Sequence, residues 1–359
     1  MELFDRKESC FGCGACAAVC PRGAVEMRAD EEGFPYPYTD GSLCSGCGSC
    51  GAVCPAKAPV HGREGQAYAV RCGDPELLLR SSSGGAFSLL AGAVLREGGL
   101  VCGARFDGDF RVVHELGTDI GPMRKSKYVQ SDASGCFGPV RDALDGGRAV
   151  LFSGTPCQCR AVQLFAGDRP GLILVALICR GVLSPGLWTD YAAWLAGGGR
   201  LEAFDFRDKR GRNDGHIVSY TVDGRETAST TDRDPIGRLY MRCLGLRPSC
   251  HSCPYSRPDT DFDFTIGDFW GVGKSFPELD DGMGVSLVIA RSRRAAELME
   301  LLGDSARVVP CDMEQAMQPA LAGPVKPTVL RKLLMRDFAR KGPDGRCDMG
   351  LILKKYAGV

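Results

Sequence analysis

Two cysteine runs near the N-terminus constrain this chain more than any other feature. Residues 10–21 read CFGCGACAAVCP and residues 44–55 read CSGCGSCGAVCP, so the spacing C-x2-C-x2-C-x3-C-P occurs twice. Three thiolates at three-residue intervals can hold one iron–sulfur cube, and a fourth cysteine followed by proline turns away to reach a second cube. The runs therefore predict two 4Fe–4S clusters with crossed ligand sets, one of Cys10, Cys13, Cys16 and Cys54 and one of Cys44, Cys47, Cys50 and Cys20.

Structural zinc is the alternative interpretation of these runs, because zinc also binds C-x2-C pairs. Zinc takes four ligands in a tetrahedron, usually as two separated pairs, and does not need a run of four that ends in Cys-Pro. The segment resembles bacterial-type ferredoxins, and residues 1–62 are assigned to a small α+β two-cluster ferredoxin domain. Electron transfer is the expected activity, but a chain of 359 residues is far longer than a ferredoxin needs.

The composition indicates which kinds of partner and which cellular compartment to expect. Lysine plus arginine and aspartate plus glutamate each number 44, which argues against a general nucleic-acid binder. The charged N-terminus has no signal-peptide core, and the most apolar run, LILVALIC (172–179), is too short to span a bilayer. We therefore expect a cytoplasmic protein with no transmembrane segment, in which the count of 19 cysteines indicates metal binding rather than a disulfide framework.

Short apolar runs bounded by glycine or proline predict buried strands at 149–154, 172–179, 264–271 and 285–290. Helix-like segments accompany them, for example 80–99 and 291–303. This alternation favours an α/β core with a mixed, substantially parallel sheet, which we assign to residues 63–325. Residues 100–106 and 111–116 are predicted to form a strand pair, and 200–245 a hairpin with long loops. The remaining 326–359 form a helical tail that either docks a partner or packs on its own domain.

Four further cysteines stand where strands or turns end. Cys157 follows one predicted strand, Cys179 ends another, and Cys250 and Cys253 form a C-x2-C pair followed by proline. Strand ends meet at one edge of a parallel sheet, so these thiols could hold a third cluster. Alternatively, the first two are buried apolar residues and the pair binds zinc or nothing. Cys159 is the substitute ligand if Cys157 is not one.

Two segments have the composition of anion sites. SSSGGAF (81–87) combines hydroxyls, glycines and a helix start, which suits a nucleotide pyrophosphate, although simple N-capping explains the serines equally well. RKSKYVQSD (124–132) offers lysines beside an aromatic residue, which suits a phosphate or a flavin edge, or else forms a solvated turn.

Taken together, RSSSGGAF, SKYVQSD, FSGTPCQ, LICRGVLSPGLW, FRDKRG, CHSCPYSRPDTDFDFTIGDFWG and DDGMGVSLVIA resemble the beta-subunit family of coenzyme F420 hydrogenases and dehydrogenases. The likeness covers residues 65–320, behind the N-terminal ferredoxin. It implies an FAD-binding flavoprotein with a further 4Fe–4S cluster on Cys157, Cys179, Cys250 and Cys253, making three clusters in all. It also implies FAD contacts from Ser81, Ser82, Ser83, Gly84, Gly85, Lys127, Tyr128, Gln130 and Ser131, with Gly154 and Thr155 near the flavin ring.

The resemblance implies an anaerobic oxidoreductase that links these clusters, through FAD, to hydride exchange with a deazaflavin or another small organic substrate. The alternative is an electron-relay subunit of a larger complex, and a redox partner protein or a homo-oligomer is expected in either case. Hydride transfer to a flavin needs no acid or base, so no catalytic side chain is assigned. Arg180, Arg207 and Lys209 are candidates for gripping an anionic substrate. The chain departs from the family with ICRG in place of ICHG, and with RGRNDGH after FRDK in place of a tryptophan-bearing turn.

Overall fold

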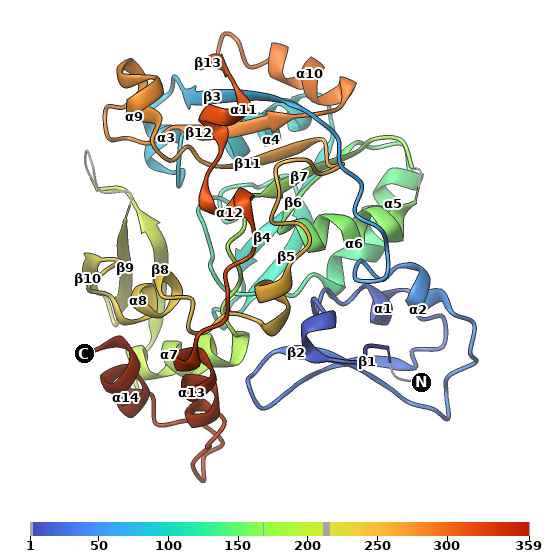
Figure 1. Cartoon of the computed structure of the whole chain (residues 1–359), viewed down its shortest axis with the longest axis vertical. Helices are drawn as coiled ribbons and strands as arrows, with labels where there is room; N and C mark the ends of the chain where they lie inside the picture. The colour runs from blue at the N-terminus through green and yellow to red at the C-terminus, as the bar shows by residue number, and fades with distance from the viewer. Residues whose placement is uncertain (1–2, 168, 211–215, 359) are drawn as a thin grey trace.

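The computed structural model describes residues 3–167, 169–210 and 216–358, which form a small cysteine-rich lobe against a larger α/β body (Figure 1). The lobe contains the antiparallel strands β1 (Val25–Ala29) and β2 (Pro35–Thr39). Short helices α1 (Ala15–Ala18) and α2 (Ser49–Ala52) lie inside the two cysteine runs. Gly14 and Gly48 precede them with φ of 81° and 78°, a left-handed backbone that glycine adopts without strain. The sequence repeat is therefore also a structural repeat.

The larger body is built on an eight-stranded sheet in the order β13-β3-β12-β11-β7-β6-β4-β5. The strands are β3 (Gln66–Cys72), β4 (Leu100–Phe106), β5 (Val112–Gly117), β6 (Val150–Gly154), β7 (Leu172–Leu177), β11 (Phe264–Asp268), β12 (Ser286–Ala290) and β13 (Ala306–Cys311). The central strands β4, β6, β7 and β11 pair in parallel, and the flanking pairs are antiparallel. The predicted mixed α/β sheet is confirmed, and β4 and β5 are the predicted strand pair.

Helices cover both faces of this sheet because the central strands bury alternate residues on opposite sides. In β6, Leu151 packs in the core beneath α4 (Ala86–Arg96) and α10 (Arg293–Glu300). Its neighbours Val150 and Phe152 pack with α5 (Phe137–Asp145) and α6 (Pro156–Ala166) on the other face. Burial on both sides explains why these strands are continuous apolar runs in the sequence.

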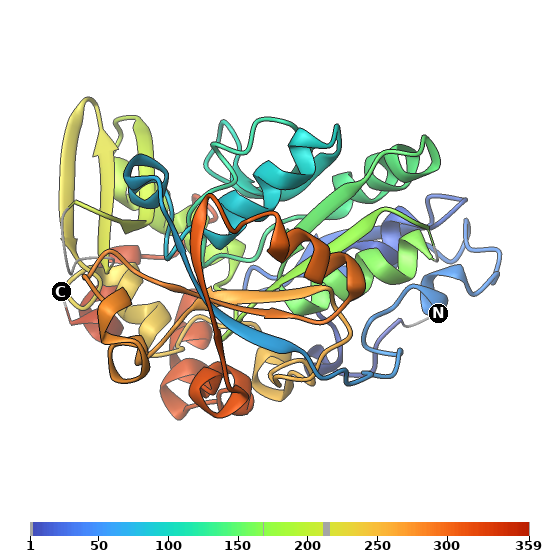
Figure 2. The ribbon, with the colours of Figure 1, turned by 90° about the horizontal axis from the view of Figure 1, so that it is seen from above.

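A second, three-stranded sheet lies on the side of the molecule away from the cysteine-rich lobe (Figures 1 and 2). It consists of β8 (Leu201–Asp208), β9 (Ile217–Val222) and β10 (Arg225–Thr230), so the predicted hairpin carries an additional strand. A core shared with α7 (Pro185–Ala196) and α8 (Pro235–Met241) includes the tail helices α13 (Val329–Phe338) and α14 (Met349–Ile352). Leu334, Met335 and Phe338 of α13 are buried there, so the tail packs on its own chain.

The lobe docks on the body through the turn between β1 and β2. Glu32 in this turn pairs with Arg331 of α13, and its backbone carbonyl accepts a hydrogen bond from Ser184. The carbonyl of the next residue, Gly33, accepts a bond from the amide of Gly186 at 3.2 Å. These contacts join the N-terminal lobe to both α7 and the tail. Within the described part of the chain, no helix is both long enough and apolar enough to cross a bilayer.

Candidate functional site

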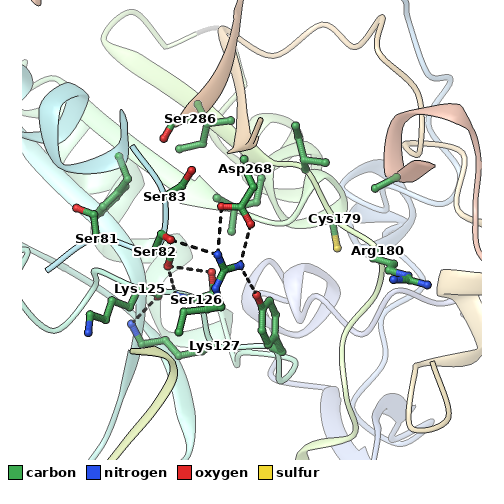
Figure 3. Close-up of a pocket in the computed structure, with 18 of the residues that line it drawn as sticks. Ser81, Ser82, Ser83, Lys125, Ser126, Lys127, Cys179, Arg180, Asp268 and Ser286 are labelled. Atoms are coloured by element: carbon green, nitrogen blue, oxygen red, sulfur yellow. Dashed lines mark hydrogen bonds and ion pairs between the residues drawn. The ribbon is translucent and has the colours of Figure 1, made fainter. Parts of the chain in front are cut away.

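A cavity of about 290 Å³ opens at the carboxyl ends of the parallel strands β6, β7 and β11 (Figure 3). Thr155 follows β6, Cys179 follows β7, and Asp268 ends β11, and all three line the cavity. Open α/β sheets place their ligand sites at this edge, because the loops that leave parallel strands meet there. The central sheet thus positions this cavity, which we call the main cavity.

The loop of Ser81–Gly85 forms one wall of the main cavity. The helix α4 begins at Ala86, and its N-cap is Gly85, which has φ of 87° and makes no side-chain cap bond. Ser81 donates instead to the carbonyl of Leu77 at 2.8 Å, and Ser83 donates to that of Val285 at 2.7 Å. The N-cap interpretation of the three serines is therefore wrong, because Gly85 is the N-cap and the hydroxyl of Ser82 accepts a hydrogen bond from the amide of Ser126.

A basic wall of the main cavity, formed by residues 124–128 and Arg207, faces the serine loop. Arg207, from β8, donates to Asp268 at 2.8 Å and to the hydroxyl of Tyr128 at 3.0 Å. Burial lowers the pKa of this guanidinium, but Tyr128 and Asp268 outweigh it and hold the pKa above its usual range. The backbone amide of Ser126 donates to the hydroxyl of Ser82 at 2.8 Å, which ties the two walls together. Figure 3 shows Asp268 between the serines on one side and Cys179 on the other.

Lys127 lies in the same wall. Burial lowers the pKa of its ammonium to about 7. The ammonium donates to the carbonyls of Pro122 and Arg124 at 2.8 and 2.6 Å, so it closes the turn that carries the segment 124–128.

The structure brings most of the predicted flavin contacts to the main cavity, namely Ser81, Ser82, Ser83, Gly85, Lys127, Tyr128 and Thr155. Gly84, Gln130, Ser131 and Gly154 are not among its lining residues. Gly84 is wedged against β3, where a Cβ would approach a backbone carbonyl at 2.1 Å. Gln130 donates to the carbonyl of Gly12 at 3.0 Å, and Ser131 accepts a bond from Gln158 at 2.9 Å. These residues serve packing and lobe contacts next to the cavity.

The three candidates for substrate contact have different surroundings. Arg207 and Arg180 line the main cavity. Lys209 does not line it, because its ammonium donates to carbonyls behind the serine loop, those of Ser83 at 2.6 Å and Met283 at 2.7 Å. Burial lowers the pKa of Lys209 to about 8. Residues 211–215, which contain most of the departing sequence RGRNDGH, lie outside the described residues.

A second cavity adjoins the main one and is lined by all four cysteines proposed for the third cluster, Cys157, Cys179, Cys250 and Cys253. Burial raises the pKa of Cys157 to about 12 and that of Cys250 to about 11, and neighbouring thiols of the set add to the increase. Against the larger effect of burial, the backbone of Gly181 acts to lower the pKa of Cys179 and that of Val182 acts to lower the pKa of Cys250, which favours their thiolate forms. Cys159, the substitute ligand, is fully buried in the core and donates to the carbonyl of Gly154.

The crossed cysteine sets of the lobe also line one cavity each. Cys10, Cys13, Cys16 and Cys54 share one, and Cys20, Cys44, Cys47 and Cys50 share the other. The amide of Gly12 donates to the sulfur of Cys10 at 3.4 Å, and that of Ala24 to the sulfur of Cys20 at 3.2 Å. Among the described residues, no group of three or more His, Cys, Asp or Glu side chains is placed to hold a single metal ion. Sulfurs that surround a cavity and accept amide bonds suit a cube.

Asp268, Trp270 and Tyr240 also line the main cavity, although no sequence motif predicted a role for them. Tyr240 stacks on Tyr128 with ring centroids 4.1 Å apart. Trp270 lies at the cavity with half of its surface exposed, and Leu177 and Met241 also expose apolar surface there. The run FTIGDFWG contained the signal for two of them, because polar and aromatic residues at a strand end often belong to sites.

Comparison with known proteins defines the class of this chain. Residues 9–58 match the model of the 4Fe-4S dicluster domain, so the chain is an iron–sulfur protein. Residues 147–315 match the model for the C-terminal part of the beta subunits of coenzyme F420 hydrogenase/dehydrogenase. The two matches confirm the resemblance drawn from the motifs: a dicluster ferredoxin domain lies in front of a region that matches the coenzyme F420 hydrogenase/dehydrogenase beta-subunit family.

Individual relatives are more distant. An uncharacterized ferredoxin of Methanocaldococcus jannaschii is 42% identical over 38 residues, which are 11% of this chain and 49% of the relative, so the match spans about half the length of that protein. A chain from the F420-reducing NiFe hydrogenase complex of Methanosarcina barkeri is similar in structure with a TM-score of 0.49 and 18% identity. That similarity covers 81% of this chain and 97% of the other.

Proposed function

We propose that this protein is an iron–sulfur flavoprotein oxidoreductase. It moves electrons between three 4Fe–4S clusters and an FAD in the main cavity, and the FAD exchanges hydride with a deazaflavin such as coenzyme F420 or with another small organic substrate. One observation carries the proposal: successive cavities share their walls. Thr155, Cys179 and Arg180 line both the main cavity and the cavity of the third cysteine set.

The sharing continues into the lobe. Phe11, in the first cysteine run, lines both the cavity of the third cysteine set and that of Cys10, Cys13, Cys16 and Cys54. Cys157 is close enough to Cys13 to raise the pKa of its thiol, after the larger effect of burial. Cys50 lines both lobe cavities. Four sites follow one another from the main cavity to the end of the lobe, as a path for single electrons requires.

The main cavity has groups that suit FAD. Ser82, Gly85 and the basic side chains Lys125 and Arg207 offer donors and positive charge for a pyrophosphate. The hydroxyl of Thr155 lies 3.2 Å from the sulfur of Cys157, so the far end of the cavity reaches the third cysteine set. FAD bound here would supply both hydride and one-electron chemistry. The chain's own task is to hold the flavin beside Cys157 and Cys179.

The exit of the path lies at the lobe surface. Cys47 is exposed, whereas the cysteines of the third set are largely covered. An exposed cluster on Cys20, Cys44, Cys47 and Cys50 would exchange electrons with a partner protein. This exposure also favours the second candidate function, an electron-relay subunit without its own substrate.

Anaerobic turnover of the isolated chain distinguishes the two functions. Purified protein is mixed with reduced coenzyme F420 and a viologen dye, and dye reduction is followed. Arg207→Gln should weaken FAD retention at least about tenfold, since it removes a buried cation that contacts Tyr128 and Asp268. Arg210→Gln removes an exposed arginine of the same segment and should bind FAD normally.

If the rate of dye reduction increases in proportion to the FAD content of the protein, the chain is an enzyme with its own substrate. Flavin-bound protein that exchanges electrons with the dye but with no organic substrate supports the relay. A chain that binds no flavin under these conditions contradicts both forms of the proposal.

A further inference from the structure

We infer that Arg247 is a positioning residue for electron transfer: its buried charge raises the reduction potentials of the first lobe cluster and the third cluster together. This inference rests on the proposed function, because it requires clusters in both cysteine cavities. Arg247 lies between α8 and the short 3-10 helix Pro248–Ser252, outside the motifs that predicted the site.

The side chain of Arg247 is 1% exposed and lies at the junction of lobe and body. Its Nε donates to the carbonyl of Cys10 at 2.8 Å, and one Nη donates to Gln130 at 2.9 Å. The other Nη donates to the carbonyl of Pro35 at 3.0 Å. The guanidinium carbon lies 4.3 Å from the ring centroid of Tyr36. Hydrogen bonds from Nε and from both Nη groups therefore fix the position of the guanidinium.

The positive charge acts on two cysteine sets. The Nε of Arg247 donates to the carbonyl of Cys10 at 2.8 Å, which places the charge beside the first lobe set. Cys10 belongs to the first lobe set, whereas Cys157 and Cys250 belong to the third set. Arg247 also lines the cavity of the third set. It therefore lies between the two proposed clusters and faces both.

All hydrogen-bond partners of this guanidinium are neutral. Among the described residues, no carboxylate forms an ion pair with Arg247, in contrast to Arg331, Arg207 and Arg160. A buried charge without a counter-charge is strongly unfavourable. A cube on four thiolates is anionic and becomes more negative when it accepts an electron, so the missing counter-charge is the pair of clusters.

The direction of the effect follows from electrostatics. A fixed positive charge stabilises the reduced, more negative form of each neighbouring cluster, so Arg247 raises both potentials. Arg247 does not line the cavity of the second lobe cluster, which is formed by Cys20, Cys44, Cys47 and Cys50. We therefore expect this cluster to keep its reduction potential. The electron is thereby favoured at the junction between body and lobe.

Potentiometric titration followed by electron paramagnetic resonance tests this inference on the cluster-loaded full chain. Arg247→Gln should shift two of three cluster potentials to more negative values and leave the third unchanged, which is an internal reference. Arg247→Lys retains the charge, so both potentials should stay close to their wild-type values. Tyr255→Phe is the matched control, because it removes the hydrogen bond from Tyr255 to the carbonyl of Pro55 across the same interface without a change of charge.

Arg247→Gln potentials equal to wild type, in protein with full iron content, would overturn the inference, as would an equal shift of all three. If Arg247→Gln loses iron, Gln130→Glu decides by the same criterion, because a carboxylate at that position neutralises Arg247 in place. A wild-type protein that lacks the third cluster refutes the proposed function instead, so the two failures are distinguishable.

Discussion

The ion pair of Glu32 and Arg331 should determine how firmly the lobe is held to the body. Both Nη groups of Arg331 donate to the carboxylate of Glu32, one of them at 2.9 Å, and Nε donates to the carbonyl of Leu246 at 3.0 Å. The two side chains are only 8% and 17% exposed. Removing one partner of a buried pair costs about 3 kcal/mol or more, because the other charge is left without compensation.

Arg331→Met should therefore reduce the free energy of undocking the lobe by about 3 kcal/mol. If the β1–β2 hairpin exchanges its amides through this opening, deuterium uptake there should accelerate roughly 100-fold, since about 1.4 kcal/mol is a factor of ten. Mass spectrometry of peptides that cover residues 25–39 measures this rate. Lys332→Met, at the exposed neighbouring position, should leave the rate unchanged.

The double variant with Glu32→Gln provides a sharper test. The second substitution removes the uncompensated carboxylate, so it should recover about 2 kcal/mol of the loss. Hairpin exchange within about threefold of wild type in Arg331→Met would refute the reasoning, as would equal acceleration by Lys332→Met.

Three further outcomes are expected. Cys179→Ala should lose about four irons per chain while Cys159→Ala keeps them all, as measured by iron analysis, because only the first lines the third cysteine cavity; equal iron loss would contradict this. Burial lowers the pKa of His114 to about 4, so the unfolded chain binds a proton that the folded one excludes between about pH 4 and 6.5. The free energy of unfolding from urea titrations should fall by about 2 kcal/mol from about pH 7 to pH 5, and His114→Gln should remove that part; identical pH profiles would exclude this role. Gly33→Ala should destabilise the protein to urea by about 2 kcal/mol, because a Cβ at φ +76° would lie 2.7 Å from the backbone of α7. Gly108→Ala, with open space around the Cβ, should change stability by less than about 0.5 kcal/mol, and equal effects would count against the packing argument.

Features with local causes were predictable from the sequence. The crossed cysteine sets follow from spacing within a few residues, and their turns depend on glycines such as Gly14 and Gly48. The buried strands were visible as apolar runs because β6 and β7 are covered on both faces. The third cysteine set could be proposed because Cys157 and Cys179 stand at strand ends, which a parallel sheet brings to one edge.

Features that depend on distant partners could not be predicted. Simple N-capping was one of two interpretations of Ser83, but its hydroxyl bonds to the carbonyl of Val285, 202 residues away. Arg247 and Arg331 carried no local signal, since their partners Cys10 and Glu32 come from the other end of the chain. The antiparallel pairing of β3 with β12 and β13 was likewise absent from the prediction, because strand order is set by tertiary packing.

The central claim is that one chain carries a continuous path from a flavin through three cubes. Anaerobic quantification of iron, acid-labile sulfide and flavin in the purified protein tests it most directly. The account predicts about twelve irons, about twelve sulfides and about one FAD per chain. About eight irons without flavin, or zinc in place of iron, would contradict it.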